Sequence, residues 1–156
     1  MIRLAPVTPE TWPEQRTPVL LLESVFPPRI RASEAQIDSE LPSTRNISVV
    51  AYDGPKLVGY GLAEPLQSRR DFPDPAGPAL RLRTLYLSSC SVDLHYRHLG
   101  IAKKLRDWRI EEGMKRGYSR FTAHIRTGCM PDPHHVIETY ENWYDYGSFD
   151  YMEILQ

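Results

Sequence analysis

The sequence contains few features that would place the protein in a membrane, outside the cell or on nucleic acid. Its longest purely apolar run, Val19 to Leu22, is far shorter than the roughly 20 residues of a membrane-spanning helix. Only two cysteines occur, Cys90 and Cys129, so the chain cannot form a disulfide framework. The formal net charge of −1 gives no general attraction to nucleic acid or membranes. We therefore expect a cytoplasmic protein with no nucleic-acid or membrane partner, and two buried, reduced thiols.

The sequence also offers no pattern of ligands for a metal ion. Neither cysteine has a partner at the spacing of a zinc site, and the pair His134 and His135 stands without a second pair of ligands. We expect no metal. With 156 residues, the chain has the length of one domain and can bury about 70% of its unfolded surface around a single core. We therefore expect a single domain over residues 1–156.

Prolines and capping residues set the helices expected in the first third of the chain. Thr8 favours a helix start with Pro9 in the first turn, whereas Pro18 predicts an interruption and a second start. Ser33 and Gln36 then have the spacing of a capping box, which predicts a further short helix.

Alternating or β-branched segments predict six strands, which cover residues 1–7, 47–53, 57–63, 80–92, 119–126 and 149–155. An Asp-Gly-Pro turn makes the second and third of these a hairpin. Residues 65–79 contain four prolines and are expected to form a loop. In the strand after this loop, the small polar residues Ser88, Ser89 and Ser91 predict a bulge where regular pairing loosens.

Two more helices are expected in the second half. The basic stretch DLHYRHLGIAKKLRDW, residues 93–108, enters a helix through a single glycine. Arg97 and Lys103 lie at its first turn, where the helix dipole favours anions, so we expect an anion there. Asp132 then predicts the start of a last helix, on which Tyr140 and Tyr144 share one face.

The turn into the basic helix carries a resemblance to a known family. Six consecutive residues fit the pattern Arg/Gln-x-x-Gly-x-Gly/Ala: Arg97, His98, Leu99, Gly100, Ile101 and Ala102. Val92 and Tyr96 also stand where that pattern has the last strand valine and a tyrosine. Together with the order of elements and the chain length, these residues make the sequence similar to the GNAT superfamily of acyl-CoA-dependent N-acetyltransferases.

The resemblance implies both a fold and a co-substrate. The fold is α/β (α+β), with a mixed, mostly antiparallel central sheet of six to seven strands flanked by about four helices. The co-substrate is acetyl-CoA, whose pyrophosphate would lie on the backbone N–H groups of residues 98–102. Gly100 lets the backbone approach the phosphates, and Arg97 and Lys103 add charged contacts. Lys104 and Arg106 either reach the ribose 3′-phosphate or only face solvent.

The resemblance further implies direct transfer of the acetyl group to an amine of a small molecule or peptide, with no covalent enzyme intermediate. A backbone N–H at Val92 or its neighbours would polarise the thioester carbonyl. A tyrosine of the last helix would protonate the departing thiolate; Tyr144 is the first choice and Tyr140 the competitor. The segment YDYGSF departs from the family pattern, because Gly147 stands one place early, and the asparagine that many members place before this tyrosine is absent.

The group that helps to deprotonate the amine stays open, because Tyr86, Glu64 and His124 are all candidates and none stands out. The sequence does not identify the acceptor, and it leaves a homodimer open. The alternative to an enzyme is a non-catalytic acyl-CoA-binding sensor or interaction module with the same fold.

Overall fold

The structure is a computed structural model of residues 1–156, which describes the backbone throughout and every side chain except that of Tyr144. The elements occur in this order: β1 (Ile2–Pro6), α1 (Trp12–Glu23), α2 (Glu34–Glu40), β2 (Ile47–Asp53), β3 (Lys56–Pro65), η1 (Leu66–Ser68), α3 (Pro78–Leu82), β4 (Thr84–Val92), η2 (Leu94–Tyr96), α4 (Ile101–Lys115), β5 (Arg120–Arg126), β6 (His134–Tyr140), η3 (Trp143–Asp145) and β7 (Phe149–Ile154). Here α marks α-helices and η marks 3₁₀-helices.

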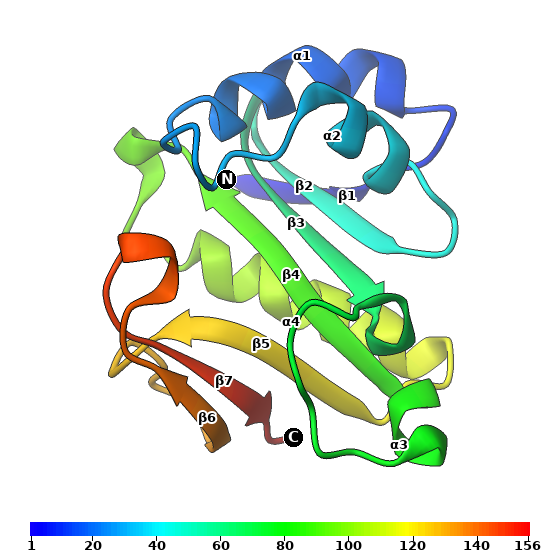
Figure 1. Ribbon diagram of the computed structural model, residues 1–156. Helices are drawn as coiled ribbons and strands as arrows, with labels where there is room; N and C mark the ends of the chain where they lie inside the picture. Colours follow the sequence, from blue (N-terminus) through cyan, green and yellow to red (C-terminus); the bar gives the residue numbers. More distant parts are fainter.

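Across the described backbone, seven strands form one sheet in the order β1-β2-β3-β4-β5-β7-β6 (Figure 1). β4 and β5 run parallel, and the other neighbouring pairs are antiparallel. A mixed, mostly antiparallel sheet with four α-helices confirms the predicted fold class. The hairpin of β2 and β3 and the capping box of α2, in which Ser33 and Gln36 bond each other's backbone, are confirmed as well.

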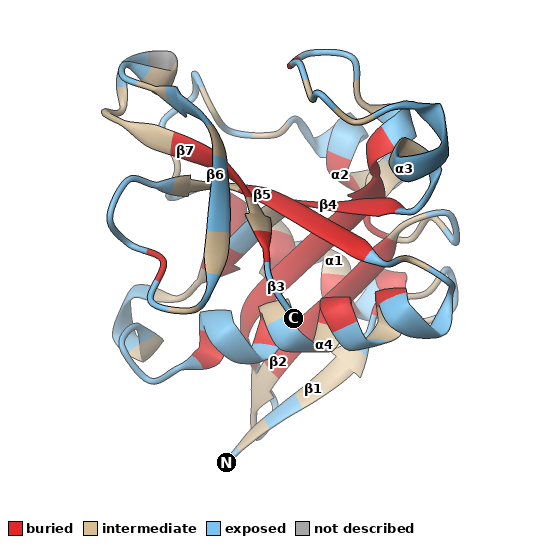
Figure 2. Ribbon diagram, turned by 90° about the horizontal axis from the view of Figure 1, so that it is seen from below, coloured by how far each residue is buried: buried red, intermediate tan, exposed pale blue. Residues whose placement is uncertain are grey.

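Helices cover both faces of the sheet. α4 packs against β2, β3 and β4 on one face, while α1 and α2 cover β2 and β3 on the other (Figure 1). The rest of that second face lies under residues 66–77, where Phe72 packs on Tyr86 and Tyr151. Figure 2 shows that the buried residues concentrate in the central strands and on the inner side of α4. Among the described residues, no helix is both long and apolar enough to cross a membrane.

The sheet opens along β4. Leu62 pairs with Ser89 and Glu64 pairs with Tyr86, so β4 carries one extra residue between these two pairs. This confirms the bulge predicted beside Ser88. β4 pairs with β5 only over residues 84–86, and the two strands diverge beyond that point. The outer edge of β4 is therefore free of a neighbouring strand toward its carboxyl end.

The predicted interruption of the first helix is wrong. α1 runs without a break from Trp12 to Glu23 with Pro18 inside it, because burial of Val19 against the sheet outweighs the hydrogen bond that the proline removes. The helix also starts later than expected, since Thr8 and Thr11 exchange hydrogen bonds around the preceding turn and Thr11 takes the N-cap position.

Two other predicted elements differ from the structure. Residues 78–82 form α3, with Pro78 at its first position, so β4 begins at Thr84 rather than at residue 80. The helix expected after Asp132 is replaced by β6, which pairs with β7 and ends at Tyr140. The β-branched residues of this segment favour a strand that pairs with β7. The four-residue spacing of the tyrosines, which suggested a helix, does not decide its conformation.

Gly113 packs so closely against the sheet that we expect alanine there to destabilise the protein. A Cβ at this position would lie 2.8 Å from Cε1 of Phe121 and 3.0 Å from Cδ2 of Leu85. Alanine gains about 1 kcal/mol of helix propensity, but overpacking a core costs about 1–3 kcal/mol. We expect Gly113→Ala to lower the free energy of unfolding in urea by about 1 kcal/mol. Gly77→Ala, whose Cβ would meet nothing within 4 Å, is the control and should change it by less than about 0.5 kcal/mol. Equal stability of the two variants would contradict this packing.

Candidate active site

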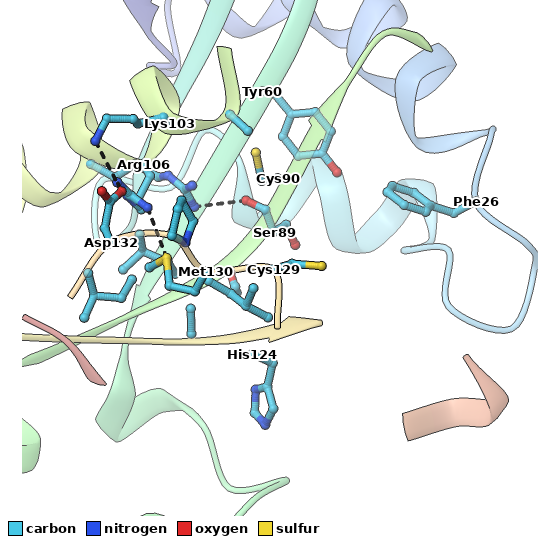
Figure 3. A pocket seen from close by; sticks show the side chains of 18 of the residues that line it. Phe26, Tyr60, Ser89, Cys90, Lys103, Arg106, His124, Cys129, Met130 and Asp132 are labelled. Carbon is cyan, nitrogen blue, oxygen red and sulfur yellow. Dashed lines mark hydrogen bonds and ion pairs between the residues drawn. The ribbon is translucent and has the colours of Figure 1, made fainter. Parts of the chain in front are cut away.

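A cavity of about 510 Å³ occupies the opening between β4 and β5. Its walls come from both strands, from α4, from residues 23–30 at the end of α1 and from the loop after β5 (Figure 3). A second cavity of about 500 Å³ adjoins it and shares Phe26, Cys90 and Ala102 as lining residues. The two cavities form one groove from the amino end of α4 to the middle of the sheet.

The turn before α4 presents backbone N–H groups to the second cavity. His98 and Gly100 both have positive φ angles, 65° and 78°, and Gly100 is the N-cap of α4 with no side-chain cap. The first N–H groups of a helix have no acceptor within it, so those of Ile101, Ala102 and Lys103 need an external partner. A Cβ at Gly100 would meet nothing within 4 Å, which leaves open space above these donors. An anion of phosphate size fits this cradle.

The predicted cofactor residues divide between the two cavities. Five of the turn residues line the second cavity together with Val92: Arg97, His98, Gly100, Ile101 and Ala102. Leu99 is exposed and lines neither cavity, and Lys103 lines the first. The guanidinium of Arg97 donates from Nε to the carbonyl of Val92 over 3.3 Å, which fixes its stem beside the turn.

Lys103 and Arg106 are both tied to the loop after β5. Lys103 Nζ lies 3.2 Å from Asp132 Oδ2, and Arg106 donates to the same oxygen and to the sulfur of Met130 (Figure 3). These bonds, that from Arg106 first, lower the pKa of Asp132. The sequence predicts that Arg106 either faces solvent or reaches the ribose 3′-phosphate. Its side chain is instead only 14% exposed and is paired with Asp132.

The free edge of β4 offers backbone donors to both cavities, since Cys90 lines both of them and Val92 lines the second. The N–H of Asp93 donates to the carbonyl of Val58 over 2.8 Å. Hydrogen-bonded and non-bonded pairs alternate along an antiparallel ladder. The pairs Val92 with Gly59 and Cys90 with Gly61 are therefore non-bonded, and the backbone polar groups of Val92 and Cys90 face away from β3 toward the opening. The sequence predicted such a donor at Val92 or its neighbours, and both residues fit.

Tyr86 and His124 form a hydrogen-bonded pair on the sheet face opposite α4. Tyr86 Oη lies 2.8 Å from His124 Nδ1. The imidazole is stacked between Trp143 and Tyr151 and points to the other side of β5 from Met130 in Figure 3. Burial, aided by the charge of Arg69, lowers the pKa of His124 to about 4. His124 is thus neutral at physiological pH. It is also one of the residues that line the first cavity.

Two other candidates lie around this pair. Glu64 is opposite Tyr86 in the ladder, but its carboxylate accepts from Arg69 over 2.9 Å and does not line either cavity. Tyr140 lies on β6 with its ring 5.5 Å from that of His124, and its buried hydroxyl has no partner among the described residues. Burial raises the pKa of Tyr140. Tyr144 belongs to η3, and its side chain lies outside the described residues.

Both cysteines line the first cavity and are exposed, so the expectation of buried thiols is wrong. They stand on the walls of an opening rather than in the core. On the opposite wall, the carboxylate of Glu23 accepts from the hydroxyl of Tyr60 and, over 2.8 Å, from the N–H of Ala32. These bonds hold the segment between α1 and α2 against the cavity.

Comparisons with known proteins find solved structures with a similar fold. No curated protein sequence matches the chain significantly. The ribosomal-protein-S18-alanine N-acetyltransferase of Escherichia coli has a similar structure, with a TM-score of 0.71 and 15% identity over 99% of this chain and 93% of that chain. The ribosomal-protein-alanine N-acetyltransferase of Brucella melitensis has a TM-score of 0.67 and 18% identity over 99% of each chain. NAA60 of Arabidopsis thaliana, solved with acetyl-CoA, has a TM-score of 0.68 and 16% identity over 99% of this chain and 98% of that chain.

At these identities, the solved structures establish a shared fold. The match to a family model is independent of them and spans residues 9–144, which includes the turn before α4 and both diverging strands. The chain therefore belongs to the acetyltransferase (GNAT) family, the acyl-CoA-dependent N-acetyltransferases that use acetyl-CoA as co-substrate.

Proposed function

We propose that the enzyme transfers an acetyl group from acetyl-CoA directly to an amine of a small molecule or a peptide. One observation carries this proposal: a single groove joins the uncapped amino end of α4 to the free edge of β4, and the Tyr86–His124 pair lies on the other side of the sheet opening. An anion cradle and carbonyl-facing donors thus follow one another along the groove, and a proton-accepting pair lies beside it, where His124 is one of the lining residues.

The cradle before α4 would hold the pyrophosphate. The N–H groups of residues 98–102 supply the donors, and the helix dipole adds attraction of about 1 kcal/mol or less. Arg97 lies beside the same cavity and adds a charge-assisted contact. From there, the pantetheine arm would follow the free edge of β4 in the manner of an added strand. This places the thioester near Cys90 and Val92.

At the thioester, the backbone N–H of Cys90 or Val92 would donate to the carbonyl oxygen. A donor fixed in this way stabilises the negative charge that develops as the amine attacks, and removing one such donor typically costs a factor of about 10²–10³ in rate. Since the donor belongs to a strand rather than to a side chain, its position depends on the bulge of β4.

The Tyr86–His124 pair would accept the proton that the acceptor ammonium loses, directly or through water, only in passing it on, since the low pKa of His124 disfavours a lasting imidazolium. A neutral imidazole bonded to a phenol can accept a proton at one end and pass it on at the other. Glu64 is held by Arg69 and is the weaker choice for this role. Tyr140 lies beside His124, so we assign it to this proton path rather than to the thiolate.

Tyr144 remains our choice for the acid that protonates the thiolate of CoA. It follows β6 in the segment that leads back to β7, just after Tyr140 and Trp143, whose rings lie against His124. Proton transfer from a phenol with a pKa near 10 to a thiolate whose conjugate thiol has a pKa near 8.5 is uphill by only about 2 kcal/mol, so a phenol can serve as the donor.

Calorimetric titration with acetyl-CoA tests the cofactor half of this proposal. We expect Gly100→Val to weaken binding at least about tenfold, because the side chain would enter the space above the phosphate donors and the residue would have to keep φ at 78°. Gly54→Val is the matched control: Gly54 also has a positive φ and open space around it, but it lies in the β2–β3 turn. We expect that control to lose stability and keep its affinity.

Thiol release with a panel of small amines and peptides tests the transfer itself. We expect release that depends on the acceptor. A wild-type protein that fails to bind acetyl-CoA would refute the whole proposal, whereas binding without release against any acceptor would refute the transfer alone.

A further inference from the structure

Arg109 brings a positive charge into the interior beneath the bulge of β4. It lies on α4 and is only 3% exposed. None of the ion pairs found among the described side chains includes it; the titratable groups that act on it are Cys90, Arg106 and Tyr60. Burial lowers its pKa, but a guanidinium stays protonated at physiological pH. Burying a charge without a counter-ion costs free energy of folding, so we expect the burial of Arg109 to serve a function.

The guanidinium bonds to backbone carbonyls instead of a carboxylate. Its Nε donates to Leu105 within α4 over 3.0 Å. Its Nη1 donates to the carbonyl of Leu62 over 2.8 Å and to that of Ser89 over 3.0 Å, the bond that ends on Ser89 in Figure 3. Leu62 and Ser89 face each other on β3 and β4 and form the last regular pair before the extra residue of the bulge. Arg109 therefore clamps the two strands where their register changes.

β3 is shaped to admit this guanidinium. Gly61 lies opposite Cys90, and a Cβ at Gly61 would be 2.8 Å from Nε and 2.9 Å from Cζ of Arg109. A glycine at this position leaves the space that the charge occupies. Arg109 is also one of the residues that line the first cavity, in which the thioester would lie.

We propose that Arg109 is a positioning residue for acetyl transfer: its clamp on Leu62 and Ser89 aims the N–H of Cys90 at the thioester carbonyl, and its charge favours electron density on that oxygen. This rests on the proposed function. In the step concerned, the amine nitrogen bonds to the acetyl carbon and the carbon–sulfur bond breaks. The sulfur leaves with the electron pair and takes a proton from the hydroxyl of Tyr144. The Tyr86–His124 pair, which has by then passed the ammonium proton on to solvent, takes the proton that the attacking nitrogen loses.

Infrared difference spectra of bound acetyl-CoA, labelled with ¹³C at the acetyl carbonyl, report directly on this polarisation. In the wild type, we expect the carbonyl stretch at a lower wavenumber than in free acetyl-CoA. Arg109→Met removes the charge and the hydrogen bonds to Leu62 and Ser89 at a similar side-chain volume. Arg109→Lys keeps the charge but lacks the planar guanidinium that donates to both carbonyls. We expect Arg109→Met to lose most of the spectral shift and to lower kcat about 10- to 100-fold, less than the loss of a direct donor. Arg109→Lys should lie between this variant and the wild type.

A pair of glycine variants tests the same idea without touching Arg109. Gly61→Ala places a methyl group against the guanidinium and should reduce the spectral shift and kcat. Gly59→Ala adds a methyl group two residues away on β3, 3.2 Å from the Ser91 carbonyl and 3.3 Å from Leu105, and none of its three nearest atoms belongs to Arg109. It controls for crowding beneath α4 and should keep both the spectral shift and kcat.

The outcomes separate this role from a merely structural one. Folded Arg109 variants with an unchanged spectral shift would overturn the proposal, whatever their stability, and so would equal effects of Gly61→Ala and Gly59→Ala. The dissociation constant of acetyl-CoA should change less than about threefold in Arg109→Lys, because the phosphate cradle lies elsewhere in the groove. Absence of acetyl-CoA binding in the wild type would refute the proposed function, and this role with it.

Discussion

Tyr86→Phe should lower kcat by about 100- to 1,000-fold, the usual contribution of a positioned proton acceptor. The change deletes the hydroxyl that lies 2.8 Å from His124 Nδ1 and leaves the ring packed against Phe72. Steady-state thiol release, together with calorimetric titration of acetyl-CoA, would measure it. Since the phosphate cradle lies at the other end of the groove, we expect the dissociation constant of acetyl-CoA to stay within about twofold.

Two further variants make this result specific. His124→Phe keeps a ring between Trp143 and Tyr151 but removes both nitrogens, and we expect a loss of kcat similar to that of Tyr86→Phe. Tyr52→Phe is the control, because Tyr52 lies on β2 with its ring beneath Arg3. If Tyr86→Phe retained more than about a third of wild-type kcat, the pair would not be the proton acceptor.

The pH dependence of the reaction follows from the low pKa of His124. With a pKa of about 4, His124 is already neutral above pH 5 and cannot cause an inflection near pH 6.5. We therefore expect kcat/KM to keep rising through neutral pH and to level off at the pKa of the acceptor amine. That is about 8 for an α-amino group and about 10.4 for a lysine side chain. The break in the profile would thus indicate which kind of amine the enzyme accepts.

Asp74→Ala should produce the largest loss of stability, about 3–5 kcal/mol, because it removes the closer carboxylate of the buried Arg120 and leaves this cation with Glu153 at 3.6 Å. The side chain of Asp74 is fully buried, and both of its oxygens accept from Arg120 Nη2 over 3.1 Å. It also accepts from the hydroxyl of Tyr151 and from the N–H of Ala76. Asp74 thereby fastens the loop before α3 to β5 and β7. Urea unfolding followed by circular dichroism would measure the change.

Asp71→Ala is the matched control for this variant. Asp71 lies in the same loop and also pairs with an arginine, Arg69, but its side chain is 50% exposed. Exposed ion pairs contribute about 0–1 kcal/mol, so we expect a change within that range. A loss of less than about 1 kcal/mol in Asp74→Ala would show that the buried network does not fasten the loop.

Acid should weaken the same network. Burial alone would raise the pKa of Asp74, but the bonds from Tyr151, Ala76 and Arg120 outweigh it and hold the pKa below its usual value. A depressed folded-state pKa means that the stabilisation is complete above the unfolded pKa of about 4 and is lost as the pH falls further. The stability advantage of the wild type over Asp74→Ala should therefore shrink below about pH 4.

Features whose determinants are local could be predicted from the sequence. The turn before α4 needs only six consecutive residues, and Gly100 takes the left-handed conformation that only glycine adopts easily. The bulge of β4 follows from a run of serines within one strand. In both cases, residues that are adjacent in the sequence determine the feature. It could therefore be predicted without knowing which distant segments are in contact.

Features that depend on register could not be predicted. Tyr86 and His124 meet only because β4 and β5 pair in parallel with Tyr86 opposite Thr122, and a whole helix separates the two strands in sequence. β6 has a helical spacing of tyrosines, but its pairing with β7 decides its conformation. In the sequence, Arg109 cannot be distinguished from a solvent-exposed arginine of a helix. Only the structure shows that Gly61 leaves space for its guanidinium.

The short contact between β4 and β5 has a consequence for cooperativity. Backbone pairing joins the part of the sheet from β1 to β4 to the part from β5 to β7 over residues 84–86 only. Two such parts can open at different free energies, as sub-global units of a fold do. A ligand that lies between them contacts both, so it should merge two unfolding steps into one as well as raise the overall stability. In this protein, the opening in which we propose that acetyl-CoA binds would then also be the boundary between two folding units, and the co-substrate would link them.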